Sequence, residues 1–324
     1  MEDTMLMSYV LDAGKNRHNM DTLSEIHLNH KTISFKDLVG TGKKEINFSE
    51  VDVEKAKDYA AEDADITFRL YKKFQKSLKD EKMINIYEIF EKPLLKILAF
   101  MEIEGVKIDN KFLKSLSTKF EKKIVKIQNE VFKISKKEFN IASPKQLGEI
   151  LYNDLKIADL KKTKKGSFAT SASVLEDLAF KGHKFPQLVL DWRQVSKLKN
   201  TYSDSLPEHI NPNTQRVHTS FLLAATTTGR LASSDPNLQN IPIKSEDGKD
   251  IRKAFIAKKD HVLISADYNQ IEMRILADLA DVKELKKAFK NNEDIHSLTA
   301  SQIFNVDIKN CLLYTSPSPR DSNL

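Results

Sequence analysis

The sequence predicts a multidomain α/β protein, and three features support that class. Its 324 residues are enough for about two domains of ordinary size. Several long segments carry apolar residues at helical spacing, and one short, continuous apolar run over residues 262–266 has the length of a buried strand. Hydrophobic residues make up 40% of the chain, which is enough for a sizeable core and too much for a disordered chain.

Four segments predict helices, namely 54–74, 87–101, 111–139 and 188–206. The third has one apolar stripe, and its opposite face is rich in lysine, for which a solvated surface is the simplest interpretation. A basic loop at Lys161–Lys165 could bind a phosphate backbone through its charge or could be a solvated turn.

Composition excludes several classes of protein. The low counts of 9 Gly and 9 Pro exclude collagen-like and low-complexity chains, and a single Cys excludes a disulfide framework or a Cys-cluster zinc site. No apolar run approaches the ~18 residues of a membrane span, and the acidic start is unlike a secretory signal, so we expect a cytoplasmic protein. The net charge of +6 suits a polyanionic partner such as nucleic acid, although many proteins without such a partner have a similar charge.

Asp267 follows the expected strand and precedes an expected helix with apolar residues from Ile271 to Leu279. A carboxylate at the exposed end of a strand is well placed for a metal ion, because the scaffold is rigid there and water can enter. Alternatively, Asp267 caps the following helix, where the helix dipole favours a negative charge. Asn269 and Glu272 have the spacing of a capping box at the start of that helix.

Three segments carry the most specific pattern. They are TGRLASSDPNLQNIP at 228–242, SADYNQIEMRILA at 265–277 and DIHSLTASQIF at 294–304. In this order and spacing they resemble the bacterial family A DNA polymerases, and the resemblance extends over nearly the whole chain to about Lys309. The stretches HKTISFKDLVG and YAAEDAD, within residues 1–80, are similar to the end of that family's 3′–5′ exonuclease domain.

The resemblance implies a division into regions. Residues 1–80 would be the C-terminal part of a ribonuclease H-like exonuclease domain, and residues 81–206 a helical thumb. Residues 207–310 would form the first part of a palm with an antiparallel sheet and the start of the fingers. We expect residues 311–324 to be a tail foreign to the family and the chain to be a fragment cut at both ends.

For the palm, the resemblance implies a magnesium and nucleotide site. Phosphoryl transfer is helped by two divalent cations about 4 Å apart, and Asp267 would hold such ions together with the backbone carbonyl of Tyr268. Glu272 would exclude ribonucleotides by a steric clash at the 2′ position, and this role is compatible with helix capping. The implied nucleotide-binding residues are Tyr268, Gln270, Glu272, His296 and Lys244.

For DNA, the resemblance implies contacts that carry no sequence preference. Arg230 would reach the minor groove at the primer end, where every base pair presents acceptors. Gln239 and Asn240 would lie nearby, and their alternative role is local turn bonding. The implied thumb residues that hold duplex phosphates are Arg193, Lys197, Asn200 and Thr201.

In the exonuclease region, Tyr59 and Asp63 match the family's Tyr-x-x-x-Asp motif and share a helix face. Asp63 would hold a metal ion while Tyr59 orients the attacking water. The family's other exonuclease carboxylates and its second palm aspartate are not found in the sequence. We therefore expect neither proofreading nor primer extension from this chain alone.

The function implied is that of a DNA-directed DNA polymerase in replication and repair. Its expected partners are primer–template duplex DNA and deoxynucleoside triphosphates, with Mg²⁺ as cofactor, and we expect a monomer associated with the nucleoid. One alternative is a non-catalytic module that binds duplex DNA. Another is an exonuclease of related fold, which the missing carboxylates disfavour.

Overall fold

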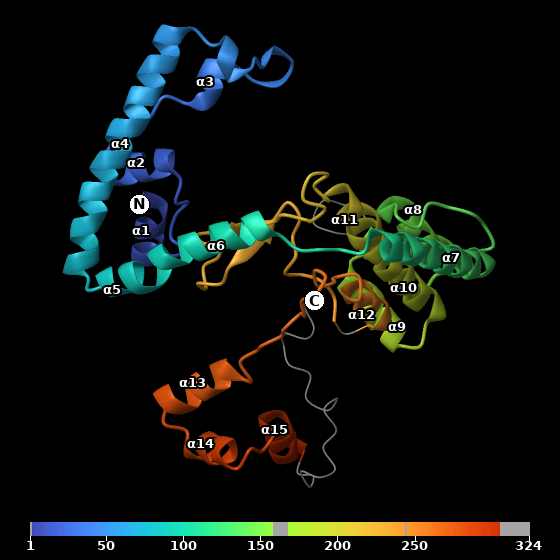
Figure 1. Ribbon diagram of the computed structural model, residues 1–324. Helices are drawn as coiled ribbons and strands as arrows, with labels where there is room; N and C mark the ends of the chain where they lie inside the picture. Colours follow the sequence, from blue (N-terminus) through green and yellow to red (C-terminus); the bar gives the residue numbers. More distant parts are fainter. Residues whose placement is uncertain (1, 158–167, 244, 305–324) are drawn as a thin grey trace. The chain divides into compact units, whose positions relative to one another are not determined.

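The computed structural model describes residues 2–157, 168–243 and 245–304 (Figure 1). The chain divides into two compact units, Met1–Ile256 and Ala257–Leu324. Over the described residues the structure is mostly helical with one small antiparallel sheet, which confirms the α/β class at this level. None of the helices in these residues is long and apolar enough to cross a bilayer.

The first unit begins with helices gathered around one long helix, α4 (Val53–Asp80), which includes the predicted 54–74 segment. Asp52 caps α4 by accepting hydrogen bonds from the backbone amides of its first turn. Its buried face packs with α1 and α2 to form the first core, which contains Ile66, Leu70, Phe74 and Leu78. The shorter elements here are α1 (Thr4–Asp12), α2 (Met20–Leu28), α3 (Phe35–Val39), η1 (Gly42–Lys44) and η2 (Phe48–Glu50).

The predicted 87–101 helix is present as two joined pieces, the π-helical η3 (Tyr87–Glu91) and α6 (Lys92–Glu104), and the short helix α5 (Ile84–Ile86) precedes them. The Tyr87 ring is fully buried, and its hydroxyl accepts a hydrogen bond from the Asp3 amide at 3.0 Å and donates one to Glu2. Burial raises the pKa of Tyr87 to about 12. The Tyr87 hydroxyl therefore holds Glu2 and Asp3 against this helix.

A second core fills the later part of the first unit around α7 (Asn110–Ser135). This confirms the predicted 111–139 helix as far as Ser135, after which the left-handed Lys136 ends it. Asp109 caps α7, and the predicted apolar stripe is buried from Leu113 to Val131. Against α7 pack α10 (Lys184–Leu198) and the π-helical η5 (Lys199–Asp204). The remaining helices of this region are α8 (Pro144–Gly148), the π-helical η4 (Glu149–Asp154), α9 (Ala172–Phe180) and α11 (Ser205–Glu208).

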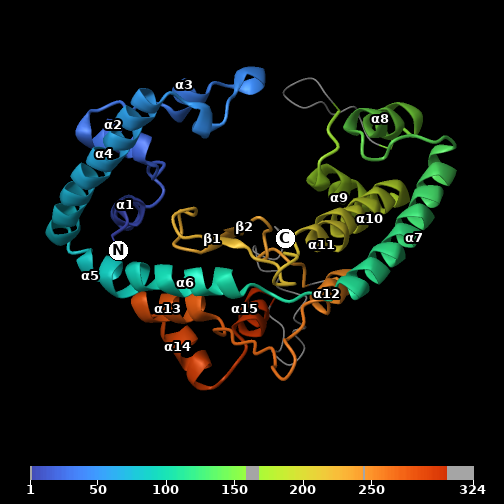
Figure 2. The ribbon, with the colours of Figure 1, turned by 45° about the horizontal axis from the view of Figure 1, so that its top comes forward.

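The sheet is a two-stranded antiparallel ladder of β1 (Ser220–Leu222) and β2 (Ala232–Ser234), with Phe221 opposite Ser233 (Figure 2). Isolated bridges join Val106 to Val217 and Ile108 to Phe255. These bridges connect the segment between α6 and α7 to the chain on both sides of the hairpin. Helix α12 (Glu246–Arg252) follows and contacts α7 and α10.

The second unit contains α13 (Ile271–Leu279), α14 (Lys283–Lys290) and α15 (Ile295–Phe304). The buried strand expected at 262–266 was a wrong prediction, since Val262 and Ile264 are 79% and 87% exposed and the segment is irregular. A strand requires a hydrogen-bonded neighbour, and none of the described residues pairs with this segment.

The predicted capping box at α13 was also wrong. Gln270, in the left-handed conformation with φ 53°, precedes the helix, so Glu272 lies one position too early for that motif. The backbone carbonyl of Asn269 instead accepts a hydrogen bond from Arg274 Nε at 3.0 Å.

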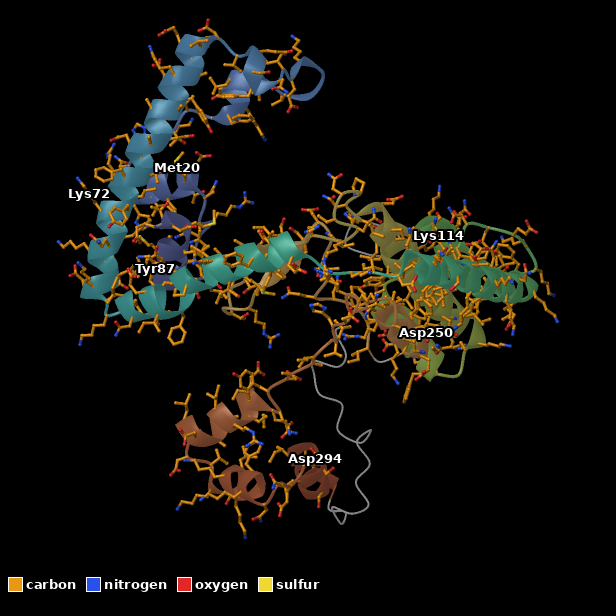
Figure 3. All side chains as sticks on the ribbon, viewed as in Figure 1. Met20, Lys72, Tyr87, Lys114, Asp250 and Asp294 are labelled. Carbon is orange, nitrogen blue, oxygen red and sulfur yellow. The ribbon has the colours of Figure 1, made fainter. Side chains whose placement is uncertain are left out.

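Two lysines on the basic face of α7 form ion pairs with α12, Lys119 with Asp250 and Lys123 with Asp247. Asp250 is labelled in Figure 3. Hydrogen bonds from Lys119 and Lys253 lower the pKa of Asp250. A carboxylate with a lowered pKa stabilises the fold above its unfolded-state pKa, and this contribution is lost as the pH falls through the folded value.

We therefore predict that Asp250→Asn lowers the melting temperature near neutral pH by an amount corresponding to at most about 1 kcal/mol. The difference from the parent protein should shrink as the pH is lowered to about 3. Glu246→Gln, on the same helix but 87% exposed at its side chain, serves as the control. If Asp250→Asn lowers the melting temperature equally at both pH values, the loss does not come from the charge of Asp250, and the prediction is wrong.

Candidate nucleic-acid interface

Three of the predicted DNA-binding residues share one exposed side of a helix. Lys197, Asn200 and Thr201 are exposed where α10 continues into η5, and their spacing places them on the same face. Leu198 and Tyr202, between and beside them, are buried in the second core. The core contacts thus orient the polar residues outward.

The structure brings this helix face next to the segment that follows β2. The buried hydroxyl of Tyr202 donates a hydrogen bond to the backbone carbonyl of Asn240 at 2.6 Å and lies 3.2 Å from the Asn240 side-chain oxygen. Thr201, Asn237 and Asn240 line one pocket of about 240 Å³. Two predicted DNA-binding positions that are distant in sequence therefore meet at one place.

Local hydrogen bonds shape the segment that carries Gln239 and Asn240. The Asn237 side chain accepts a hydrogen bond from the Gln239 amide at 2.9 Å, while Gln239 and Asn240 are themselves exposed. Arg252 of α12 donates to the carbonyls of Ile241 and Pro242 at 3.1 and 3.2 Å. Sequence reasoning missed Arg252, because its partners are backbone atoms ten and eleven residues away, and no motif marks such a contact.

Arg193 is placed differently from the other predicted contacts on α10. Its guanidinium is half-buried and donates a hydrogen bond to the Thr170 carbonyl at 2.7 Å. Burial lowers the pKa of Arg193. At least one of its donors is thus used inside the protein, where it joins α10 to the segment before α9.

Arg230 lies in an exposed turn within the connection between β1 and β2. Gly229 before it has φ 77°, a left-handed conformation that favours glycine. The Thr226 hydroxyl donates to the Arg230 backbone carbonyl at 2.7 Å and closes the turn.

In the second unit, Asp267 and Tyr268 are exposed. The Gln270 side chain donates to Asp294 Oδ1 at 3.3 Å, and the other oxygen of Asp294 accepts hydrogen bonds from Ser297 at the start of α15. The second and third sequence motifs are therefore adjacent. Lys244 and the Lys161–Lys165 loop lie outside the described residues, as does the side chain of His296.

Tyr59 and Asp63 share a face of α4, as predicted. The Tyr59 ring packs near Phe35 and Phe48, and burial raises the pKa of Tyr59, with a further contribution from the charge of Asp63. Burial also raises the pKa of Asp63, whose Oδ1 atom is buried without a hydrogen-bond partner among the described residues. Asp63 lines a pocket of about 720 Å³ together with Glu2.

Neither Asp63 nor Asp267 has enough neighbouring donors among the described residues to complete a metal site. The part of the chain that the structure describes contains no group of three His, Cys, Asp or Glu side chains able to hold a metal ion. The unpartnered oxygen of Asp63 could accept a cation, but the carboxylate of Glu2 in the same pocket bonds Lys92 and Tyr87. No chemical step is therefore assigned to a metal ion here.

The exposed lysine, asparagine, threonine and arginine side chains described above are of the types that contact the phosphates and sugars of nucleic acids. The model of the "DNA polymerase family A" family matches residues 110–313, and that of the "3'-5' exonuclease" family matches residues 1–79. The chain belongs to the family A DNA polymerases, which confirms the resemblance seen in the three motifs.

Among curated proteins, DNA polymerase I of Rhizobium leguminosarum is 49% identical over 308 residues, covering 95% of this chain and 30% of that protein. DNA polymerase I of Pseudomonas aeruginosa is 44% identical over 308 residues, covering 95% and 34%. The chain thus spans about a third of the length of these relatives.

A solved structure, the polymerase domain of Pol1 from M. smegmatis in complex with a DNA primer–template and dNTP, matches with a TM-score of 0.81 and 31% identity. The match covers 97% of this chain and 52% of that chain.

Proposed function

We propose that this chain carries the primer–template-binding part of a DNA-directed DNA polymerase, which extends a primer 3′ end with deoxynucleotides in DNA replication and repair. Family membership and the relatives named DNA polymerase I support this assignment. The observation that carries it is the meeting of Thr201 with Asn240 beside Lys197 and Asn200. The predicted thumb residues and the motif at 228–242 thereby contribute to one exposed polar surface.

Each part of that surface has a distinct chemical task in the proposal. Lys197 neutralises a backbone phosphate, and the side chains of Asn200, Thr201 and Asn240 donate hydrogen bonds to phosphate and sugar oxygens. Arg230 donates to the minor-groove acceptors that all base pairs share, with Gln239 nearby in the chain. Such contacts hold a duplex at its primer end without reading its sequence.

The regional assignment belongs to the same proposal. Residues 1–80 would be the C-terminal part of a ribonuclease H-like exonuclease domain, residues 81–206 the thumb, and residues 207–310 the palm and start of the fingers. The two family matches and the packing of α7 against α10 support it.

Family A DNA polymerases are metal-dependent, generally using Mg²⁺. We assign Asp267 as a candidate Mg²⁺ ligand, Asp63 as a second one beside Tyr59 in the exonuclease region, and Tyr268 and Glu272 as nucleotide contacts. We extend the nucleotide contacts to Gln270, His296 and Lys244 by their places in the motifs. Because the family's second palm aspartate is not found in the sequence, we expect this chain alone to bind duplex DNA without extending a primer.

Fluorescence anisotropy with a labelled primer–template duplex tests the proposal. We expect tighter binding to the duplex than to a single strand of the same length. Arg230→Ala should weaken duplex binding about tenfold, since a hydrogen bond from a charged donor contributes on the order of 1.5–3 kcal/mol. Arg69→Ala, which removes an exposed arginine from α4, should leave the affinity unchanged.

Equal affinity for duplex and single strand would refute the binding assignment. Primer extension by the purified chain with Mg²⁺ would refute the expectation that it binds without chemistry. It would also separate an active polymerase from a purely DNA-binding module.

A further inference from the structure

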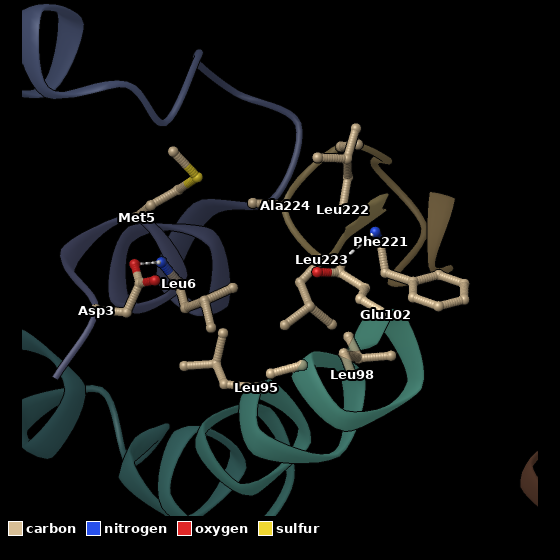
Figure 4. A pocket seen from close by; sticks show the side chains of 12 residues that line it. Asp3, Met5, Leu6, Leu95, Leu98, Glu102, Phe221, Leu222, Leu223 and Ala224 are labelled. Carbon is tan, nitrogen blue, oxygen red and sulfur yellow. Dashed lines mark hydrogen bonds between the residues drawn. The ribbon is translucent and has the colours of Figure 1, made fainter. Parts of the chain in front are cut away.

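The connection between β1 and β2, which carries Arg230, packs against the N-terminal region of the first unit. Leu223 and Ala224 in this connection contact the first core, which contains Leu6 and Met7 of α1. Figure 4 shows Leu223 facing Leu6 and the α6 residue Leu95 across a pocket of about 490 Å³. The exonuclease-like part of the chain thus supports one side of the hairpin.

Two hydrogen bonds in series lead from α1 to the Arg230 backbone. The Tyr9 hydroxyl donates to the Thr226 carbonyl at 2.8 Å, and the Thr226 hydroxyl donates to the Arg230 carbonyl at 2.7 Å. Tyr9 is only 4% exposed, so its bond is shielded from competing water.

A close contact between Gly14 and Thr227 accompanies these two hydrogen bonds. Gly14, just after α1, has φ 84°, and a Cβ atom built there would lie 2.7 Å from Thr227 Cγ2. The loop after α1 therefore comes against the turn at the residue next to Thr226. Tyr9 and Gly14 together hold adjacent positions of the Thr226–Arg230 turn.

Tyr9 is itself fixed by its neighbours. Its ring meets the ring of His18 edge-on, with centroids 5.5 Å apart, and Ser8 Oγ lies 3.0 Å from His18 Nδ1. All three residues are buried. The Tyr9 hydroxyl is thus presented to Thr226 from a preorganised site rather than from a mobile side chain.

We propose that Tyr9 is a positioning residue for Arg230, so that the exonuclease-like region orders the turn that grips the primer end. Two strands of three residues each provide few bonds to order such a connection, and each unrestrained residue would lose conformational entropy on meeting DNA. By ordering the turn in the free protein, Tyr9 lowers the entropy cost of binding DNA. The consequence for DNA affinity rests on the proposed function, whereas the ordering of the turn does not.

Tyr9→Phe tests the proposal, because it removes the hydroxyl and keeps the ring. Amide hydrogen exchange at residues 226–230 should quicken about fivefold, as expected when a bond contributing about 1 kcal/mol is lost. Thr226→Val, which removes the second donor, should reproduce this change. Tyr152→Phe is the matched control, since its buried hydroxyl donates to the Ala169 carbonyl at 2.7 Å in a different region.

The dissociation constant for primer–template DNA should rise about fivefold in Tyr9→Phe by the same reasoning. In an Arg230→Ala background, Tyr9→Phe should add no further loss. Additive losses would overturn the proposal, because a general structural defect does not depend on Arg230.

Hydrogen exchange at 226–230 that Tyr9→Phe leaves unchanged would likewise overturn it. A parent chain that fails to prefer duplex DNA would instead count against the proposed function. In that case the exchange measurement still decides whether Tyr9 orders the turn.

Discussion

Replacing Phe120 with alanine should lower the free energy of unfolding of the second core by about 3–5 kcal/mol. The Phe120 side chain is fully buried at the centre of the α7 stripe. Its removal forfeits the burial of a large apolar surface and leaves a cavity that tightly packed neighbours cannot fill.

Urea unfolding followed by tryptophan fluorescence provides the measurement. Trp192 is the single tryptophan of the chain and packs against this core, so its emission reports on the region that the mutation perturbs. Val125→Ala, on the same helix but 47% exposed, is the control and should cost less than about 1 kcal/mol. An equal effect of the two substitutions would show that α7 does not bury the stripe described here.

The helices were predictable from sequence because their signals are local. The stripe on α7 repeats at helical spacing, and Asp109 supplies an N-cap within three residues of its partner amide, so a short window of sequence contains the information. The α4 helix is similar, with Asp52 as its cap.

The segment 262–266 shows where such a signal fails. Its apolar run has the composition of a strand, but strand formation depends on a hydrogen-bonded neighbour that a local pattern cannot reveal. The start of α13 was missed for a related reason. The left-handed conformation of Gln270 shifts the helix start by one residue, although Asn269 and Glu272 have the spacing of a cap.

The candidate interface likewise has one part that local sequence patterns predict and another that they do not. Lys197, Asn200 and Thr201 lie on one helix face, which their spacing predicts. The meeting of Thr201 with Asn240 accompanies the hydrogen bond from Tyr202 to Asn240, a contact between residues 38 positions apart that no spacing rule contains. The link from Tyr9 to Thr226 joins residues 217 positions apart and was equally beyond local inference.

The proposed surface also predicts that duplex affinity falls as the salt concentration rises. Each phosphate that a protein neutralises releases counterions, so the logarithm of the binding constant falls with the logarithm of salt concentration with a slope of about −0.9 per contact. Each such contact should weaken binding about 3.5-fold when the salt is raised from about 50 to about 200 mM.

Substitution of Lys197 tests whether the phosphate contact lies on the proposed surface. Lys197→Ala should make the slope shallower by about 0.9, because one phosphate contact is lost. Lys79→Ala removes the same charge from an exposed position on α4 and should leave the slope unchanged. The two variants therefore separate a contact at this surface from a general loss of positive charge.

The salt titration of primer–template affinity for the parent chain, Lys197→Ala and Lys79→Ala tests the central claim most directly. The account predicts the same negative slope for the parent and Lys79→Ala and a slope shallower by about 0.9 for Lys197→Ala. An affinity independent of salt, or slopes that the two lysine substitutions change equally, would contradict the assignment of this surface as the duplex-binding site.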